Sequence, residues 1–280
     1  MMLDSIGEAG SAAAEPAPLS TKVERLCVEG RALREAGRYA EAETVLLRAL
    51  AVAHSDDLLV VEAANELGVL YKYMARFDEA EALYRRALRV VAAIDGGAPL
   101  GEATLWHNLG GLEHSRGRFA LAEPAARRAV ALRIRELGPD HPAVLLDQAA
   151  LAPILAALGR HDEAETLLEH VLEAFRELYG THHYEVAVAA NNLAALKHRV
   201  GEDEAARDLW NLSLRIKRDV LGPAHPELAP TLVNLGVLSA KTGDDERARD
   251  LFEEALRVLG GDVGDGHPAR RAAIASLAAL

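Results

Sequence analysis

Apolar side chains recur at helical spacing along almost the whole chain. In the segments TLWHNLGGLEHSRG (104–117) and RFDEAEALYRRALRVV (76–91), apolar residues fall at positions i, i+3 or i+4, and i+7. This spacing places them on one face of a helix and leaves the charged residues on the other, which predicts amphipathic helices. Each segment of the first kind ends in a short turn and is followed by a segment of the second kind. The sequence therefore predicts consecutive helical hairpins.

The hairpins recur with a fixed period. The turn residues Gly117, Gly159, Gly201 and Gly243 are 42 residues apart, and the series continues back to Ala75 and, by a shorter step, to Gly37. Two further series have the same 42-residue step: Gly138, Gly180, Gly222 and Gly264, preceded by Gly96, and His141, His183, His225 and His267. A repeated supersecondary unit buries its apolar face against the next copy, so we expect a stacked array of about six hairpins.

Small residues at two positions indicate where the paired helices touch. Seven residues before each turn stand Gly30, Gly68, Gly110, Ala152, Ala194 and Gly236, and five residues after it stand Ala42, Ala80, Ala122, Ala164, Ala206 and Ala248. Small side chains allow two helices to approach closely. We expect the larger apolar residues beside them to form a continuous core: Leu67, Leu109, Leu151, Leu193 and Leu235 on the first helices, and Leu46, Tyr84, Leu168, Trp210 and Phe252 on the second. The turn glycines fit a positive φ.

Composition narrows the class of protein. The net charge of −12 disfavours binding to phosphate backbones, so nucleic acid is not an expected partner. The single cysteine, Cys27, excludes an internal disulfide framework. Residues 1–21 are rich in Ala, Pro, Ser and Gly, without the pattern of a secretory signal, and we expect them to be disordered. No apolar run is long enough for a membrane span, so we expect a cytoplasmic protein without a membrane partner.

Several motifs resemble those of tetratricopeptide repeats, and most closely the longer repeat found in kinesin light chains. The motifs are Asn191-Asn192-Leu193-Ala194, Gly37-Arg38-Tyr39 with Glu41-Ala42-Glu43, and the linker Leu137-Gly138-Pro139-Asp140-His141-Pro142, which recurs as Leu221-Gly222-Pro223-Ala224-His225-Pro226. The resemblance covers residues 22–268. It implies an all-α, right-handed superhelical solenoid whose first helices line a concave groove, and a peptide or protein partner in that groove.

We place the six repeats at 22–57, 58–100, 101–142, 143–184, 185–226 and 227–268, followed by a partial seventh repeat, or capping helix, at 269–280. The fourth repeat departs from the others, because Ala149 and Ala150 replace the asparagines and Pro153 stands inside its first helix. A proline there removes a backbone hydrogen bond and favours a kink, which predicts an irregularity in the middle of the groove. The apolar character of residues 269–280 predicts weak self-association through this end.

The candidate groove residues fall into a polar and a basic set. Asparagine side chains both donate and accept hydrogen bonds and can pair with a peptide backbone. The polar set consists of Asn65, His107, Asn108, Asn191, Asn192 and Asn234. The basic set, about one helical turn later, consists of Lys72, His114, His198, Arg199 and Lys241. The basic set suits acidic side chains or a terminal carboxylate of a partner. An alternative remains for both sets: the asparagines bond between neighbouring hairpins, and the basic residues only neutralise helix C-termini.

The sequence offers little for catalysis. The recurring histidines lie one repeat apart, and no cysteine cluster or His-Glu-x-x-His motif indicates a metal site. Cys27 lies within a helix and is expected to be packed, and the glycines near residue 260 lack the lysine of a phosphate-binding loop. We therefore expect no cofactor and no enzyme activity. The sequence favours a scaffold or adaptor that binds its partner in the concave groove; a structural assembly component that uses its ends and convex face is the alternative.

Overall fold

The computed structural model describes residues 19–53, 57–94, 97–260 and 267–280, and in these residues it contains helices and no strand. The helices are α1 (Leu19–Glu35), α2 (Tyr39–Val52), α3 (Asp57–Tyr73), α4 (Phe77–Ala93), α5 (Pro99–Ser115), α6 (Phe119–Leu137), α7 (Pro142–Ala157), α8 (His161–Tyr179), α9 (Tyr184–Arg199), α10 (Asp203–Leu221), η1 (Pro226–Leu228), α11 (Ala229–Lys241), α12 (Asp245–Leu259) and α13 (Pro268–Leu277). Most of the 1–21 segment expected to be disordered lies outside the described residues, as do Gly96 and Gly264, whereas residues 19–21 already belong to α1.

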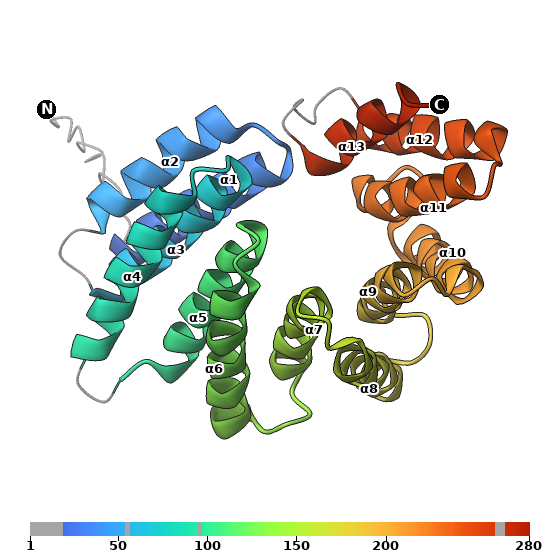
Figure 1. The fold of residues 1–280 in the computed structure, drawn as a ribbon. Coiled ribbons are helices and arrows are strands. Elements are labelled where there is room, and N and C mark those ends of the chain that lie inside the picture. The colour runs from blue at the N-terminus through green and yellow to red at the C-terminus, as the bar shows by residue number, and fades with distance from the viewer. Residues whose placement is uncertain (1–18, 54–56, 95–96, 261–266) are drawn as a thin grey trace, which may run out of the picture.

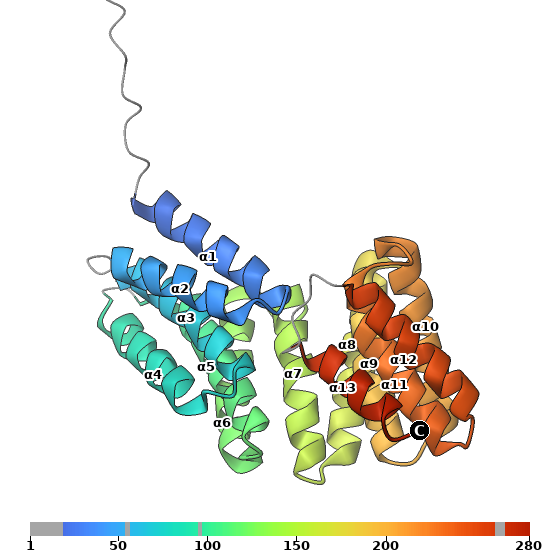
Figure 2. The ribbon, with the colours of Figure 1, turned by 90° about the horizontal axis from the view of Figure 1, so that it is seen from above.

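The helices form six antiparallel hairpins that stack into a right-handed superhelical solenoid, as the sequence predicts. Each odd-numbered helix from α1 to α11 pairs with the even-numbered helix that follows it, and α13 packs on α12 and α11. In Figure 1, α7, α9 and α11 face the interior of the arc, and α8, α10 and α12 lie outside it. The solenoid curves strongly enough to bring α13 back towards the first hairpins, as both views show (Figures 1 and 2).

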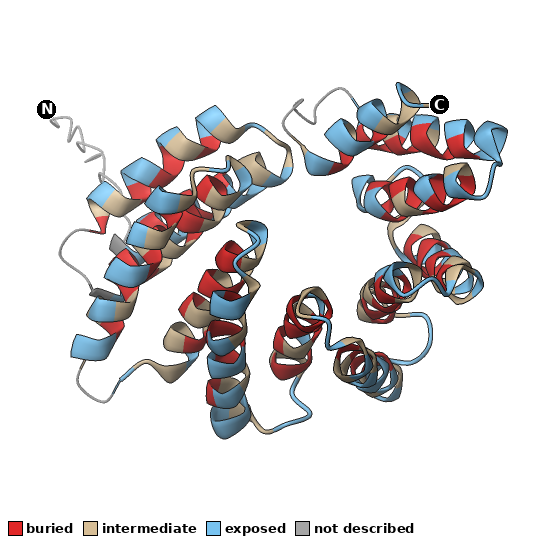
Figure 3. Ribbon diagram, in the orientation of Figure 1, coloured by how far each residue is buried: buried red, intermediate tan, exposed pale blue. Residues whose placement is uncertain are grey.

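Buried residues lie along both helices of each hairpin (Figure 3), and they form four hydrophobic clusters that follow one another along the solenoid. The predicted large core residues are all buried: Leu67, Leu109, Leu151, Leu193 and Leu235 on the inner helices, and Leu46, Tyr84, Leu168, Trp210 and Phe252 on the outer ones. Ala42, Ala80, Ala122, Ala164, Ala206 and Ala248 are completely inaccessible. The prediction of a core built from these positions is confirmed.

The small residues of the inner helices face the bulky ones of the outer helices. A Cβ atom on Gly236 would lie 2.5 Å from Cε1 of Phe252, and one on Gly68 would lie 2.5 Å from Cε1 of Tyr84. Such distances are far inside van der Waals contact, so a glycine lets the aromatic ring lie against the inner helix. The prediction that small residues allow close approach is therefore confirmed; the partner is an aromatic ring at Gly68 and Gly236, and the Leu46 side chain at Gly30.

The turns between paired helices have the predicted left-handed backbone. Gly117 has a φ of 72°, and the equivalent Ala75 has a φ of 58°. Among the described residues, Ala75 is the one residue other than glycine with a positive φ. The hydrogen bond from the backbone N–H of Arg76 to the carbonyl of Tyr71 closes this turn at 2.8 Å, as that from Arg118 to Glu113 closes the next.

Ion pairs join the outer edges of consecutive hairpins. Arg76 pairs with Glu43 of the previous hairpin at 2.6 Å, and Arg160 pairs with Glu123 of the previous hairpin at 2.5 Å. The acidic residues at the starts of the even-numbered helices also suit the positive end of the helix dipole. The charged residues near the ends of these helices therefore have a structural role: they join neighbouring hairpins and stabilise helix ends.

The fourth hairpin accommodates its proline within a continuous helix. Pro153 lies inside α7, which extends without interruption from Pro142 to Ala157. A proline also stands inside α6, at position 124. Neither proline ends its helix.

Candidate functional site

The interior of the arc is the surface on which the sequence places its candidate residues. The asparagines form hydrogen bonds from one inner helix to the next. Asn108 on α5 donates from Nδ2 to Oδ1 of Asn65 on α3 at 2.6 Å, and Asn234 on α11 donates to Asn191 on α9 at 3.5 Å. The hydroxyl of Thr231 also donates to Asn191, at 3.3 Å. These bonds fix the register between neighbouring hairpins, which is the role that the alternative interpretation of the asparagines describes.

His107 occupies the position of an asparagine and joins a similar link. Its Nδ1 lies 2.7 Å from Oδ1 of Asp147 on α7, and Asp147 also pairs with Arg133 on α6. Arg133 in turn donates to the hydroxyl of Thr104 at 2.9 Å. Asp147 is buried, with 1% of its side chain exposed, whereas 35% of the His107 side chain remains exposed. A buried carboxylate thus orients an accessible imidazole, and no pattern in the sequence pointed to Asp147.

Asn192 lacks such a link. Its side chain forms no hydrogen bond with another residue in the described part of the chain, and Asn192 lines a cavity of about 300 Å³ between α7 and α9. The lining also includes Leu146, Pro153, Leu196 and Arg199. Ala149 and Ala150, which stand where other repeats have asparagines, are also part of the lining.

The basic residues separate into paired and unpaired groups. His198 and Lys241 both contact Asp203, at 2.7 Å and 2.8 Å. Hydrogen bonds from Lys241 and His198 lower the pKa of Asp203. Both residues therefore have an acidic partner within the chain. Lys72, His114 and Arg199 have no such partner: none forms an ion pair with another described residue.

Three of the four recurring histidines cap helices with their side chains, and His267 makes no such bond. The backbone N–H of Ala143 donates to Nδ1 of His141 at 3.1 Å, and the equivalent bonds to His183 and His225 are both 3.2 Å. An imidazole nitrogen here satisfies one of the amides that a helix start leaves without a partner. The His-Pro pairs at residues 141–142 and 225–226, with the proline at the first helical position, are the sequence signal that indicates this role.

The remaining sites of potential chemistry are structural in the described residues. Cys27 is completely buried, and burial raises the pKa of its thiol to about 12, so the thiolate is scarce at neutral pH. No group of three or more His, Cys, Asp or Glu side chains in the described residues is arranged to hold a metal ion. Among these residues, none of the helices combines the length and the apolar character that crossing a membrane requires.

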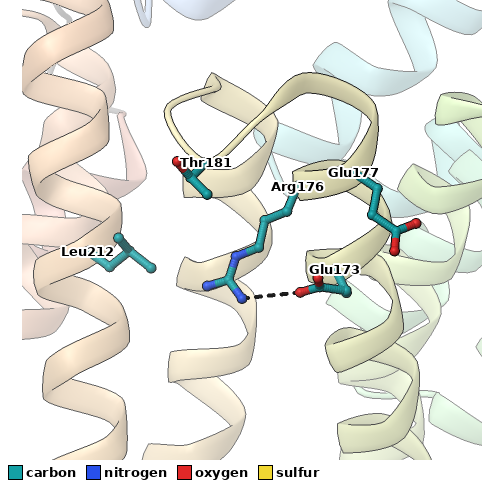
Figure 4. A pocket seen from close by; sticks show the side chains of 5 residues that line it. All are labelled: Glu173, Arg176, Glu177, Thr181 and Leu212. Carbon is teal, nitrogen blue, oxygen red and sulfur yellow. Dashed lines mark hydrogen bonds and ion pairs between the residues drawn. The ribbon is translucent and has the colours of Figure 1, made fainter.

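A shallow depression on the outside of the arc has a different character. Figure 4 shows Arg176 lying between Glu173 and Thr181 near the end of α8, with Leu212 of α10 opposite. The guanidinium already donates to Glu173 at 3.3 Å. The interior of the arc, with its unpaired cations and its cavity, is the better candidate site.

Comparison with known proteins agrees with this architecture. A profile of the tetratricopeptide repeat family matches residues 26–93, 148–219 and 185–259, and a second profile of the same description matches residues 103–143. The regulatory protein AfsR of Streptomyces griseus is 34% identical over 143 residues, which are 50% of this chain and 13% of that protein. The chain thus corresponds to a small part of the length of this relative.

Two solved structures show the same fold. Kinesin light chain repeats from Podosopora anserina superpose with a TM-score of 0.58 at 19% identity, over 74% of this chain and 99% of that one. NprR in complex with its cognate peptide NprX superposes with a TM-score of 0.66 at 14% identity, over 95% of this chain and 73% of that one. The resemblance to kinesin light chain repeats that the sequence indicates is therefore confirmed.

Proposed function

Because the chain belongs to the tetratricopeptide repeat family, we propose that it is a protein-interaction module that binds a segment of a partner polypeptide along its concave face, without catalysis of its own. The observation that carries this proposal is the cavity between α7 and α9. It is lined by apolar side chains, and the amide of Asn192 and the guanidinium of Arg199 are also part of its lining. A cavity with mostly apolar walls and a few polar groups is typical of a binding site.

The rest of the inner wall supports the same function. Asp147 holds the His107 side chain, which is still 35% exposed. Its imidazole can therefore form a hydrogen bond with the backbone of a peptide on the concave face. The asparagines have further donor and acceptor capacity beyond the bonds that link the hairpins. The fold of NprR in complex with its cognate peptide is similar to that of this chain, which agrees with a peptide as the partner.

Filling the cavity tests the proposal. Ala195 is an exposed residue in the cavity lining, and A195W puts a large ring there; A82W makes the same change on the exposed surface of α4 and serves as the matched control. Peptides selected from a random display library on the unmodified chain should lose at least about tenfold in affinity for A195W, which corresponds to about 1.4 kcal/mol, and keep their affinity for A82W. Selected peptides that bind A195W and A82W equally well would contradict binding in this cavity.

A further inference from the structure

A further cavity lies in the groove between α4 and α6, the outer helices of the second and third hairpins. Its volume is about 430 Å³, and residues of α5 form its base. The apolar part of its lining consists of Trp106, Leu109, Leu121, Pro124 and Ala125. Leu121 is 58% exposed, so part of this apolar surface is open to solvent. We call this site the outer cavity.

The rest of the lining carries charges of both signs. Glu81 of α4 and Glu113 of α5 supply two carboxylates, and the guanidinium groups come from Arg85, Arg118 and Arg128. The three arginine side chains are between 54% and 64% exposed, whereas those of Glu81 and Glu113 are 20% and 6% exposed. The outer cavity therefore has carboxylates in its interior and guanidinium groups at its rim.

Glu113 has a carboxylate oxygen without a hydrogen-bond donor. Its Oε1 accepts a hydrogen bond from Arg116 at 3.1 Å, whereas Oε2 is buried and accepts none in the described part of the chain. Nη1 of Arg118 lies 3.7 Å from Oε2, which is too far for a hydrogen bond. Arg116 is also shared with Asp78 and Glu81, so one guanidinium serves three carboxylates. A buried carboxylate oxygen that lacks a donor destabilises the protein, and a donor that enters the cavity would remove this destabilisation.

The residues that give the outer cavity its chemistry are particular to the third repeat. The equivalents of Trp106 in the other repeats are Leu26, Ala64, Gln148, Ala190 and Leu232. The equivalents of Glu113 are Leu33, Tyr71, Leu155, Lys197 and Ser239. No other repeat therefore combines an aromatic ring with a carboxylate at these two positions. Stacking of one hairpin on the next does not require this combination, because the other repeats stack without it.

A ligand of the outer cavity has to match both signs of charge and an apolar wall. A simple cation would meet the three arginines at the rim, and a simple anion would meet the two carboxylates inside. An apolar α-amino acid has an ammonium group, a carboxylate and an apolar side chain on one carbon atom, and it thus matches all three parts of the lining. A volume of about 430 Å³ lies within the usual range for small-molecule sites.

We infer that the outer cavity binds a free apolar α-amino acid in its zwitterionic form. The ammonium group donates to Oε2 of Glu113 once the exposed side chain of Arg118 rotates away from it. The carboxylate binds to Arg85 and Arg128 at the rim, which keep further donors beyond their ion pairs with neighbouring carboxylates. The side chain of the ligand packs on the apolar residues of the lining. This site goes beyond the proposed function, because it takes a small molecule and shares no lining residue with the cavity between α7 and α9.

Isothermal titration calorimetry of the full chain with L-leucine and L-phenylalanine tests the inference. At least one of the two should bind with a Kd below about 1 mM. For the tighter of the two, the amide lacks the carboxylate and the N-acetyl derivative lacks the ammonium group, whereas glycine lacks the apolar side chain. Each of these three compounds should bind at least about tenfold more weakly. No binding of either amino acid, or equal binding of the amino acid and its amide, would overturn the inference.

Two variants with matched controls locate the ligand. E113Q removes the charge of Glu113 and keeps its size, and E169Q makes the same change at an exposed carboxylate of α8. L121S removes exposed apolar surface from the lining, and L178S removes it from α8. E113Q and L121S should each weaken the amino acid about tenfold, and both controls should leave its affinity unchanged. Because Leu121 and Leu178 are both exposed, equal affinity in L121S and L178S would contradict binding in the outer cavity. A195W should keep its affinity for the amino acid, so the failure of this inference and the failure of the proposed function are distinguishable.

Discussion

Ala75 occupies in the second hairpin the turn position that Gly117 occupies in the third, and both residues have a positive φ, of 58° and 72°. A side chain in this conformation brings its Cβ close to the following carbonyl oxygen, whereas glycine avoids that contact. The period of the sequence imposes the same turn on both residues. Ala75 is therefore a strained position that the stacking of the hairpins maintains.

Replacing Ala75 with glycine should remove this strain. A75G should increase the free energy of unfolding by about 0.5–1 kcal/mol, because the relief of the left-handed conformation exceeds the entropy lost by a glycine. Urea unfolding followed by circular dichroism measures the change. G117A should have the opposite effect. Destabilisation by A75G would contradict the assignment of strain to this turn.

The contact between Gly236 and Phe252 predicts a second effect. G236A should destabilise the protein by about 1–3 kcal/mol, because the added methyl group meets the buried ring of Phe252. G101A, which adds a methyl group 3.8 Å from its nearest neighbour near the start of α5, is the matched control and should leave the urea midpoint unchanged or raise it. F252L in the G236A background should recover part of the loss. An unchanged midpoint in G236A would show that the two helices do not approach this closely.

The fold follows from the sequence more completely than the site does. The pairing of helices and the turn at Ala75 depend on local spacing and on a period that is visible in the chain. The partners of His107 and Lys241 depend on how neighbouring hairpins are displaced along their axes: Asp147 follows His107 by 40 residues, whereas Asp203 precedes Lys241 by 38. Each repeat also adds a small rotation, and the sum of these rotations lets Arg199 of the fifth hairpin lower the pKa of His114 in the third. The period can be read from the sequence, but the total rotation over several repeats cannot.

The same distinction explains which candidate residues the structure brings together. The asparagine links join positions 43 residues apart, which is the period plus one, so the sequence contained a signal for them. The basic residues stand two or three positions before the turn and nevertheless separate into paired and unpaired groups. Asp203 at the start of α10 makes this difference, because it lies within reach of both His198 and Lys241.

The ion pairs along the outer edge predict a loss of stability in acid. The hydrogen bond from Arg127 lowers the pKa of Glu123, and Arg160 lowers it further, below its ordinary value of 4.5. A carboxylate with a lowered pKa in the folded state contributes stability above the pKa of the unfolded state and loses that contribution as pH falls through the folded value. The urea midpoint should therefore decrease as pH falls below about 5. E123Q should reduce this decrease, whereas E169Q, which changes an exposed carboxylate without an ion pair to a described residue, should not.

The last helix provides a prediction about assembly. α13 packs on α12 and α11 through the buried Ala269 and Ala273. Ile274 of the same helix is 51% exposed. Exposed apolar surface at the end of a repeat array favours association with another array.

The chain should therefore self-associate weakly, and I274E should reduce that association because it places a charge in the contact. V28E, which makes the same kind of change at an exposed valine of α1, should leave association through α13 unaffected. Light scattering over a range of protein concentrations measures the mass of each variant; a monomeric mass for the unmodified chain at the highest concentration would refute this role for α13.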